Sequence, residues 1–215
     1  MQQKKPVSSE DNKSLVSLFT KNLSHVEHFI FFGTLLGFIR EGEPISGDDD
    51  VDIFVNKIHF DEIKKVIKKL DFVIDENHYP NTTEFFLQAK GQIKENDVTI
   101  DFYFYDSDID EDYIIEYWTG HSAPEKEDSI LKIPKALIFP LNKRKFNGLE
   151  LDVPHHSEVV CEYLYGISWR VPARYLIDYA TFCHGGRLIN YKFMKVKNLF
   201  STKKIFKKVV KKLLW

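Results

Sequence analysis

The chain contains only two cysteines among its 215 residues, Cys161 and Cys183. They lie far apart in the sequence, and neither has the Cys-x-x-Cys or Cys/His spacing of a zinc or redox site. We expect two free, mostly buried thiols in a reducing compartment, with a single disulfide as the alternative. The cysteine pattern therefore argues against a small secreted domain that is held together by disulfides.

Long apolar segments are also missing. No run approaches the roughly 18 consecutive apolar residues that read as a membrane-spanning helix. Residues 1–14 are polar and lack the apolar centre of a signal peptide. These absences lead us to expect a cytoplasmic protein, and the basic tail described below leads us to expect it as a peripheral protein on the inner face of the cell membrane.

Acidic residues are absent from the C-terminal end. Residues 187–215 contain ten Lys and Arg and no Asp or Glu, whereas the rest of the chain contains 20 basic and 32 acidic residues. An acidic body with a basic tail indicates that the tail has a partner of its own. We expect one main domain over residues 1–186 and a separate basic tail over residues 187–215.

The end of this tail, residues 199–215, has the pattern of a basic amphipathic helix with lysines on one side. Its apolar side consists of Ile205, Phe206, Val209, Val210, Leu213, Leu214 and Trp215. Such a helix is typical of binding to an anionic membrane surface. Docking of the apolar side on the domain is one alternative. Nucleic-acid binding is another, but the acidic body argues against it, and we predict no nucleic-acid partner.

Apolar periodicity and turn residues predict both helices and strands. An Asn147-Gly148 pair indicates a tight β-hairpin, and Gly91 with Asn96-Asp97 marks the loop between two later strands. The predicted helices span 11–28, 34–41, 58–70, 113–118 and 155–165, and the predicted strands span 29–32, 51–55, 72–74, 84–90, 98–105, 130–133 and 136–139.

Four carboxylates fall within five residues: Asp48, Asp49, Asp50 and Asp52. Because side chains alternate along a strand, Asp50 and Asp52 should share one face, and Asp49 should point away from Asp48 and Asp50. Neighbouring carboxylates repel one another unless a cation lies between them. The spacing therefore predicts a site for Mg²⁺ or Mn²⁺ that bridges to substrate phosphates, with Asp48 as a further ligand or a supporting residue.

Three further residues precede the acidic cluster. Gly33 breaks a predicted strand and lets the backbone approach a phosphate, and Thr34 at the start of the next helix can bind that phosphate. Arg40 can pair with a phosphate or structure the acidic loop. Simpler structural roles are open for all three: a turn at Gly33, a helix N-cap at Thr34 worth about 1 kcal/mol, and neutralisation of the acidic cluster by Arg40.

A later carboxylate, Asp101, lies within the apolar and aromatic run 99–104. A charge in such a strand is expensive to bury without a partner. We expect Asp101 to join Asp50 and Asp52 as a catalytic residue and metal ligand. The alternative is an outward-facing residue on an edge strand.

These motifs together resemble a known family. Gly33-Thr34 followed by Asp50-Val51-Asp52 resembles the signature of the nucleotidyltransferase superfold. The fuller string from Gly33 through Arg40 to Ile53 resembles the LicD/fukutin-related phosphotransferases. The later motifs Phe139-Pro140-Leu141, Tyr163-Leu164-Tyr165-Gly166 and Trp169-Arg170-Val171-Pro172 also resemble this family, so the resemblance covers residues 29–172. In this family the acidic cluster commonly follows Ile-Pro-Trp, whereas this chain has Ile45-Ser46-Gly47.

The resemblance implies a fold, a cofactor and a reaction. The fold would be α/β (α+β), a nucleotidyltransferase-like mixed, mostly antiparallel sheet flanked by helices, with Asp101 as the third catalytic carboxylate. The enzyme would use Mg²⁺ or Mn²⁺ to move a phospho-alcohol from a CDP-alcohol donor to a sugar hydroxyl. The acceptor would be a cell-surface glycan, such as lipopolysaccharide or capsule, or its lipid-linked precursor. Phosphocholine is the first expectation for the transferred group, with ribitol or glycerol phosphate also possible.

Two other functions fit the same residues. One is a nucleotidyltransferase that transfers NMP to a small molecule or a protein and releases pyrophosphate. The other is a non-enzymatic binding subunit that shares the fold. The presence of all three Asp residues argues against the binding subunit.

Overall fold

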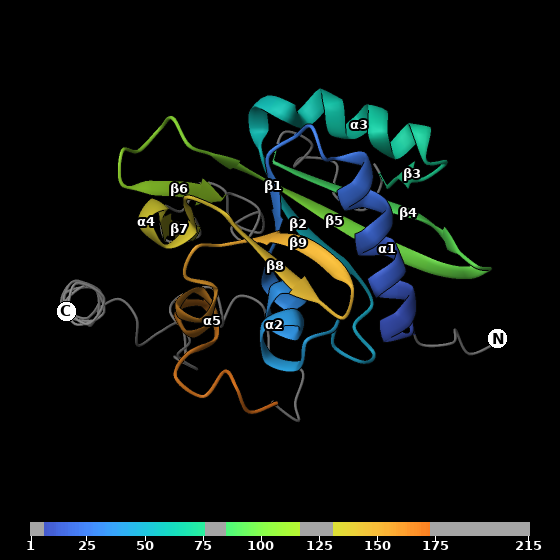
Figure 1. Cartoon of the computed structure of the whole chain (residues 1–215). Coiled ribbons are helices and arrows are strands. Elements are labelled where there is room, and N and C mark those ends of the chain that lie inside the picture. The colour runs from blue at the N-terminus through green and yellow to red at the C-terminus, as the bar shows by residue number, and fades with distance from the viewer. Residues whose placement is uncertain (1–6, 76–84, 117–130, 173–215) are drawn as a thin grey trace, which may run out of the picture.

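The computed structural model of the chain describes residues 7–75, 85–116 and 131–172. In this part of the chain a mixed sheet has helices on both faces, and a separate β-hairpin lies beside it (Figure 1). The elements are α1 (Ser9–Asn22), β1 (His28–Ile30), α2 (Phe32–Glu41), β2 (Val51–Asn56), the 3₁₀ turn η1 (Lys57–His59), α3 (Phe60–Lys69), β3 (Val73–Ile74), β4 (Phe86–Ile93), β5 (Asn96–Asp106), β6 (Tyr113–Glu116), β7 (Leu131–Pro134), α4 (Lys135–Ile138), β8 (Asn142–Phe146), β9 (Leu149–Val153) and α5 (Ser157–Tyr165).

The long strand β5 is the centre of the sheet. It pairs with β2 in parallel, with β4 antiparallel along its first two thirds, and with β6 at its end. The strand order is β1-β2-β5-β4-β3, and β7 extends the sheet beyond β6. The remaining pairs are antiparallel, so the predicted mixed, mostly antiparallel sheet is confirmed.

Both faces of β2 and β5 are buried, and aromatic rings fill much of each face. On one face Phe102 packs against Phe19 of α1 with ring centroids 5.5 Å apart, and α3 covers the end of β5. On the other face the ring centroids of Phe54 and Phe31 lie 4.1 Å apart, and the Phe54 ring stacks on that of Tyr103. Alternation along the strands places Asp52 on the same face as Phe54, and Asp101 on the same face as Tyr103.

Helix α2 starts directly after β1 in a sharp turn. Phe31 is extended, and Phe32 has a positive φ of 39°, so the chain reverses within two residues. The Phe31 N–H donates to the backbone oxygen of Asp52 at 3.1 Å, which holds the start of α2 beside β2. The predicted strand 29–32 is therefore shorter, because β1 ends at Ile30 and Phe32 already belongs to the helix.

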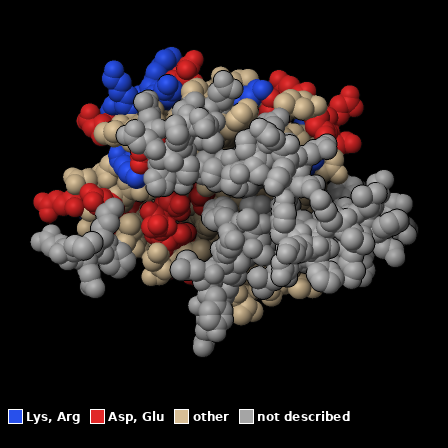
Figure 2. All heavy atoms as spheres, turned by 180° about the vertical axis from the view of Figure 1, so that it is seen from behind, with Lys and Arg blue, Asp and Glu red and all other residues tan. Residues whose placement is uncertain are grey.

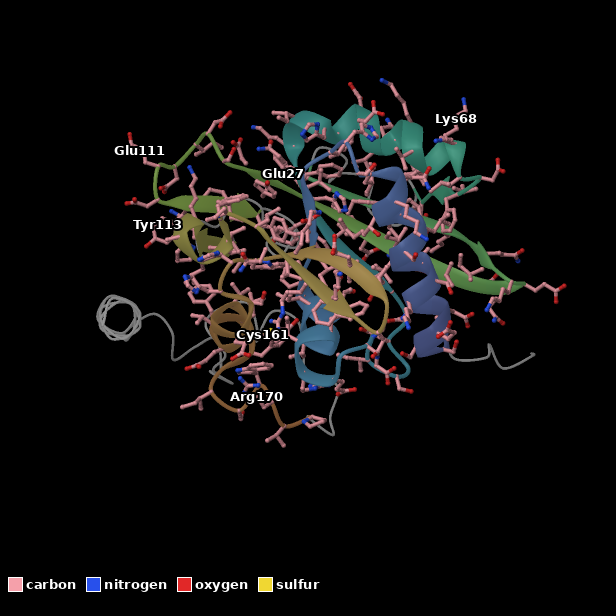
Figure 3. The ribbon with its side chains drawn as sticks, viewed as in Figure 1. Glu27, Lys68, Glu111, Tyr113, Cys161 and Arg170 are labelled. Carbon is pink, nitrogen blue, oxygen red and sulfur yellow. The ribbon has the colours of Figure 1, made fainter. Side chains whose placement is uncertain are left out.

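The predicted β8–β9 hairpin is confirmed. Asn147 and Gly148 both have positive φ, as a two-residue hairpin turn requires. Helix α5 follows this hairpin and contacts α2 and α4. It carries Cys161, which is fully buried and has no disulfide partner among the described residues (Figure 3). Burial raises the pKa of this thiol to about 12, so it is unreactive at neutral pH. Cys183 and the predicted tail lie outside the described residues.

Two predicted elements were wrong, and the first helix was predicted too long. Residues 113–116 form strand β6 and not a helix, because Ile114 and Ile115 are buried in pairing with neighbouring strands. The predicted strand 136–139 is instead the short helix α4, whose Lys135 side chain donates to the carbonyls of Ser107 and Asp110. The first helix ends at Asn22, since the chain must turn to enter β1.

The turn between β4 and β5 also differs from the prediction. It lies at Lys94 and Glu95, both of which have positive φ, whereas Gly91 lies inside β4. A Cβ at Gly91 would lie 2.6 Å from the ring of Phe72. The glycine therefore makes room for a core aromatic ring and does not form a turn.

Candidate functional site

The pairing of β2 with β5 brings the predicted carboxylates together. Asp52 and Asp101 are direct partners in the parallel register, and Asp50 lies two residues before Asp52. One carboxylate oxygen from each of Asp50, Asp52 and Asp101 lies within 4.8 Å of the others. Asp101 is 5% exposed on the central strand, so its alternative placement on an edge strand is excluded.

A second group of carboxylates adjoins the first. Oxygens of Asp48, Asp49 and Asp50 also lie within 4.8 Å of one another. The expectation that Asp49 points away from its neighbours is therefore wrong, although its side chain is exposed. The reason is that these residues precede β2, and a loop does not impose the strict alternation of a strand. Asp50 belongs to both groups and links the loop to the sheet.

Four carboxylates of the cluster bind protons more tightly than a free Asp side chain does, namely Asp48, Asp50, Asp52 and Asp101. Burial is the main cause and repulsion between neighbouring carboxylates adds to it. Together they raise the pKa of Asp50 to about 8 and that of Asp52 well above the usual value of 3.8. Burial is also the first cause for Asp48, whose pKa rises to about 6, and for Asp101, whose pKa rises to about 7. The positively charged groups among the described residues therefore do not neutralise the carboxylate cluster.

The start of α2 holds Asp52. The Thr34 backbone N–H donates to Asp52 Oδ2 at 3.2 Å, and Thr34 Oγ1 accepts from the Asp52 N–H at 2.8 Å. Thr34 is therefore not the N-cap of the helix, which is Phe31 without a side-chain cap. The positive end of α2 points at a carboxylate of the protein itself, an arrangement that favours negative charge there.

Glycine at position 33 leaves room for two carboxylates that lie close to its backbone. A Cβ built on Gly33 would lie 3.0 Å from Asp48 Oδ2 and 3.3 Å from Asp52 Oδ2. The first distance is tighter than nearly all real Cβ contacts, so a side chain at this position would push on the cluster. Gly33 thus permits a close approach between the start of α2 and two carboxylates, and its predicted role at a phosphate stays a prediction.

Sequence reasoning missed Gln88, which lies on β4 opposite Asp101. Its side-chain amide donates to Asp101 Oδ1 at 3.0 Å and opposes the rise in the pKa of that residue. The only sequence signal was a polar residue between apolar ones in a predicted strand. That signal does not identify Gln88, because the register that places it beside Asp101 depends on the β4–β5 turn.

Gly37 and Arg40 lie further along α2. A Cβ on Gly37 would lie 2.8 Å from the Glu43 oxygen and from the Ile45 nitrogen, so this glycine lets the loop before the acidic cluster pack on the helix. Arg40 forms an ion pair with Glu41 at 2.6 Å. Its predicted role at a phosphate or in the acidic loop stays a prediction.

The group formed by Asp50, Asp52 and Asp101 fits a divalent cation. Asp52 Oδ1 is buried and has no hydrogen-bond partner among the described residues, which is costly for a carboxylate oxygen unless a cation or a proton neutralises it. Carboxylate oxygens that converge from two strands are also the donors that Mg²⁺ and Mn²⁺ prefer. Asp50, Asp52 and Asp101 therefore form a candidate metal site. Seen from behind, Asp and Glu side chains gather near the middle of the described surface (Figure 2).

Comparison with known families agrees with this geometry. Residues 25–156 match the family described as LicD/FKTN/FKRP, nucleotidyltransferase domain, which is more than half of the chain. The chain belongs to the LicD family. The match contains α2 and the segments that carry the carboxylates, which are the loop before β2, β2 itself and β5, and it begins after α1. Membership in this family indicates a transferase.

The other comparisons add little. A search of curated proteins found no match. Among solved structures the chain is similar to the lincosamide antibiotic adenylyltransferase LnuA with lincomycin bound, at 13% identity and a TM-score of 0.47. The similarity covers 70% of this chain and 82% of LnuA. Within the described residues, no helix is long and apolar enough to cross a membrane.

The raised pKa values predict how stability depends on pH in the metal-free protein. Between about pH 4 and pH 8 the folded protein binds more protons at Asp50 than the unfolded chain does, so unfolding becomes easier as pH rises. Asp50→Asn removes the carboxylate whose ionisation in the folded protein is unfavourable. The variant should gain about 1–3 kcal/mol in free energy of unfolding over wild type at pH 8 and much less at pH 5. Urea unfolding in EDTA at both pH values measures the difference.

The control for this measurement is Glu95→Gln, which removes an exposed carboxylate outside the cluster. It should change stability by less than about 0.5 kcal/mol at both pH values. Equal stability of wild type and Asp50→Asn at pH 8 would contradict the repulsion described here.

Gly33→Ala tests the close approach of α2 to the carboxylates. We expect the Kd for Mn²⁺ to rise about 10-fold, which corresponds to about 1.4 kcal/mol, because the new Cβ displaces carboxylate oxygens. Stability should not fall, since Ala favours the helix over Gly by roughly 0.5–1 kcal/mol. Isothermal titration calorimetry with Mn²⁺ and a thermal melt measure the two quantities. Unchanged Mn²⁺ affinity would show that the carboxylates tolerate the methyl group.

Proposed function

We propose that this LicD-family protein transfers a phospho-alcohol from a CDP-linked donor to a sugar hydroxyl, with a bound Mg²⁺ or Mn²⁺. The acceptor would be a cell-surface glycan or its lipid-linked precursor. Phosphocholine is the first candidate for the transferred group, and ribitol or glycerol phosphate are alternatives. The observation that carries the proposal is the convergence of Asp50, Asp52 and Asp101 in a member of this family.

The proposed reaction is a displacement at phosphorus. The acceptor hydroxyl oxygen attacks the donor phosphorus that bears the alcohol, the bond from this phosphorus to the bridging oxygen breaks, and CMP leaves with that oxygen. A cation held by Asp50, Asp52 and Asp101 would neutralise the phosphate oxygens during this displacement. Asp101 is our candidate for accepting the proton of the attacking hydroxyl.

The surrounding residues would keep these groups in position. Thr34 fixes the backbone and one carboxylate oxygen of Asp52, and Gln88 fixes one oxygen of Asp101. Both carboxylates are therefore oriented before the donor binds, which lowers the cost of assembling the reacting groups. We propose that Gly33 and Thr34 border the donor phosphates and that Asp48 extends the carboxylate shell. Arg40 remains a candidate for binding a phosphate only if its ion pair with Glu41 opens.

Donor binding tests the proposal directly. With Mg²⁺ present, one of CDP-choline, CDP-ribitol and CDP-glycerol should stabilise the protein more than CTP or ATP does. At 100 times the Kd the gain should be about 2.7 kcal/mol, seen as a higher melting temperature. The preferred donor should also release CMP. Asp52→Asn should lower this release at least about 100-fold, since a catalytic cation contributes several kcal/mol.

Glu95→Gln is the control and should release CMP at the wild-type rate. Pyrophosphate released from CTP or ATP, with no CMP from the CDP-alcohols, would identify NMP transfer instead. No stabilisation by any nucleotide would favour the binding subunit, and full activity of Asp52→Asn would refute the role of the cluster.

We also propose that residues 199–215, which lie outside the described part, bind the anionic surface of a membrane. Each Lys near such a surface is worth about 1 kcal/mol, and the tail would hold the enzyme beside a lipid-linked acceptor. Deletion of 199–215 should abolish sedimentation with vesicles containing 30% phosphatidylserine, while donor binding stays unchanged. Phosphatidylcholine vesicles are the control. Undiminished binding of the truncated protein to the anionic vesicles would remove this role.

A further inference from the structure

Helix α1 lies before the part of the chain that matches the LicD family, yet two of its side chains reach the loop that carries the acidic cluster. Asn12 Nδ2 donates to the backbone oxygen of Asp48 at 3.0 Å. Ser9 Oγ donates to the backbone oxygen of Pro44, also at 3.0 Å. The two contacts lie about one helical turn apart on α1 and at opposite ends of the segment 44–48.

The position of Asn12 is unusual for its residue type. It lies on the buried face of α1 with Leu15, Val16 and Phe19, and it is 1% exposed. Asn is a weak helix former, and Leu would suit this face better. Within the part of the chain that the structure describes, its Oδ1 is also buried without a hydrogen-bond partner. The bond to Asp48 fixes the amide with its nitrogen toward the loop, so Oδ1 cannot turn to find a partner there.

A buried acceptor without a partner is destabilising, and stability alone would not favour Asn at this position. What Asn12 adds is the position of Asp48. The Asp48 backbone starts the run of three carboxylates that leads into β2, and Asp48 N–H closes a turn to the Ile45 oxygen at 3.2 Å. Gly37 of α2 bounds the same segment on another side. The loop is thus held between α1 and α2.

We infer that Asn12, supported by Ser9, is a positioning residue for the metal site: it fixes the loop so that the Asp48 and Asp50 carboxylates face Asp52 and Asp101. This inference rests on the proposed function, because it assumes that these carboxylates bind a cation. It extends the functional unit beyond the family domain to a helix that contributes no metal ligand.

The test is Mn²⁺ binding to the full chain by calorimetry, which needs neither donor nor acceptor. Asn12→Leu keeps the size of the side chain and removes both the donor and the unpartnered oxygen. We expect its Kd for Mn²⁺ to rise about 5- to 10-fold, as for one lost hydrogen bond, while its melting temperature does not fall. Ser9→Ala, a truncation on the half-buried first turn, should raise the Kd by a smaller factor and keeps the test valid if Asn12→Leu fails to fold.

The matched control is Asn22→Leu on the same helix. Asn22 donates to the Leu18 oxygen at 2.9 Å, far from the acidic loop, and its replacement should leave Mn²⁺ affinity unchanged. Wild-type affinity in both Asn12→Leu and Ser9→Ala would overturn the inference while leaving the metal site intact. Absence of Mn²⁺ binding in the wild-type protein would instead overturn the proposed function, so the two failures are distinguishable.

Discussion

The repulsion among buried carboxylates is the constraint on which the site depends. Parallel pairing of β2 and β5 sets Asp52 directly beside Asp101, and neighbouring strands lie only about 4.8 Å apart. Two carboxylates at that separation with little access to water cannot both be ionised cheaply. The fold nevertheless brings a third, Asp50, into the same space. Such an arrangement is stable at neutral pH only with protons or a cation among the oxygens.

The surrounding structure holds the carboxylates without neutralising them. Thr34 and Gln88 offer N–H donors to Asp52 and Asp101, and α2 directs its positive end toward Asp52. The near-continuous aromatic layer of Phe31, Phe54 and Tyr103 on the same face keeps β2, β5 and α2 in fixed relation. Hydrogen bonds from neutral groups orient a carboxylate but supply no full positive charge, so the oxygens remain available to a cation.

Much of this arrangement could be predicted from local patterns. The Asp50-Val51-Asp52 pattern predicted that the two carboxylates lie together, and their oxygens do so although Asp50 precedes β2. An Asp inside the apolar run of β5 likewise indicated a need for a partner. The hairpin at Asn147-Gly148 was also predictable, because that pair suits positive φ at both positions. These features depend on neighbours in sequence, where side-chain periodicity and turn chemistry decide the outcome.

The features that were missed depend on contacts between distant segments. Residues 113–116 have a short apolar pattern that suits helix or strand, and only pairing with β5 and β7 decides for the strand. Thr34 looked like a helix cap because caps are common for Thr, but Asp52 takes up both of its polar groups. Gln88 and Asn12 gave no usable signal, since their partners lie 13 and 36 residues away.

The site therefore combines two kinds of support. Asp52 and Asp101 lie on adjacent central strands, where backbone pairing and aromatic packing fix them. Asp48 and Asp49 lie on a loop whose backbone is held by contacts with α1 and α2, and Asp50 joins the two parts. The strand carboxylates are thus placed by the sheet, whereas the position of the loop carboxylates depends on the contacts with α1 and α2. Sequence changes in α1 would then alter the site through the loop without touching a carboxylate.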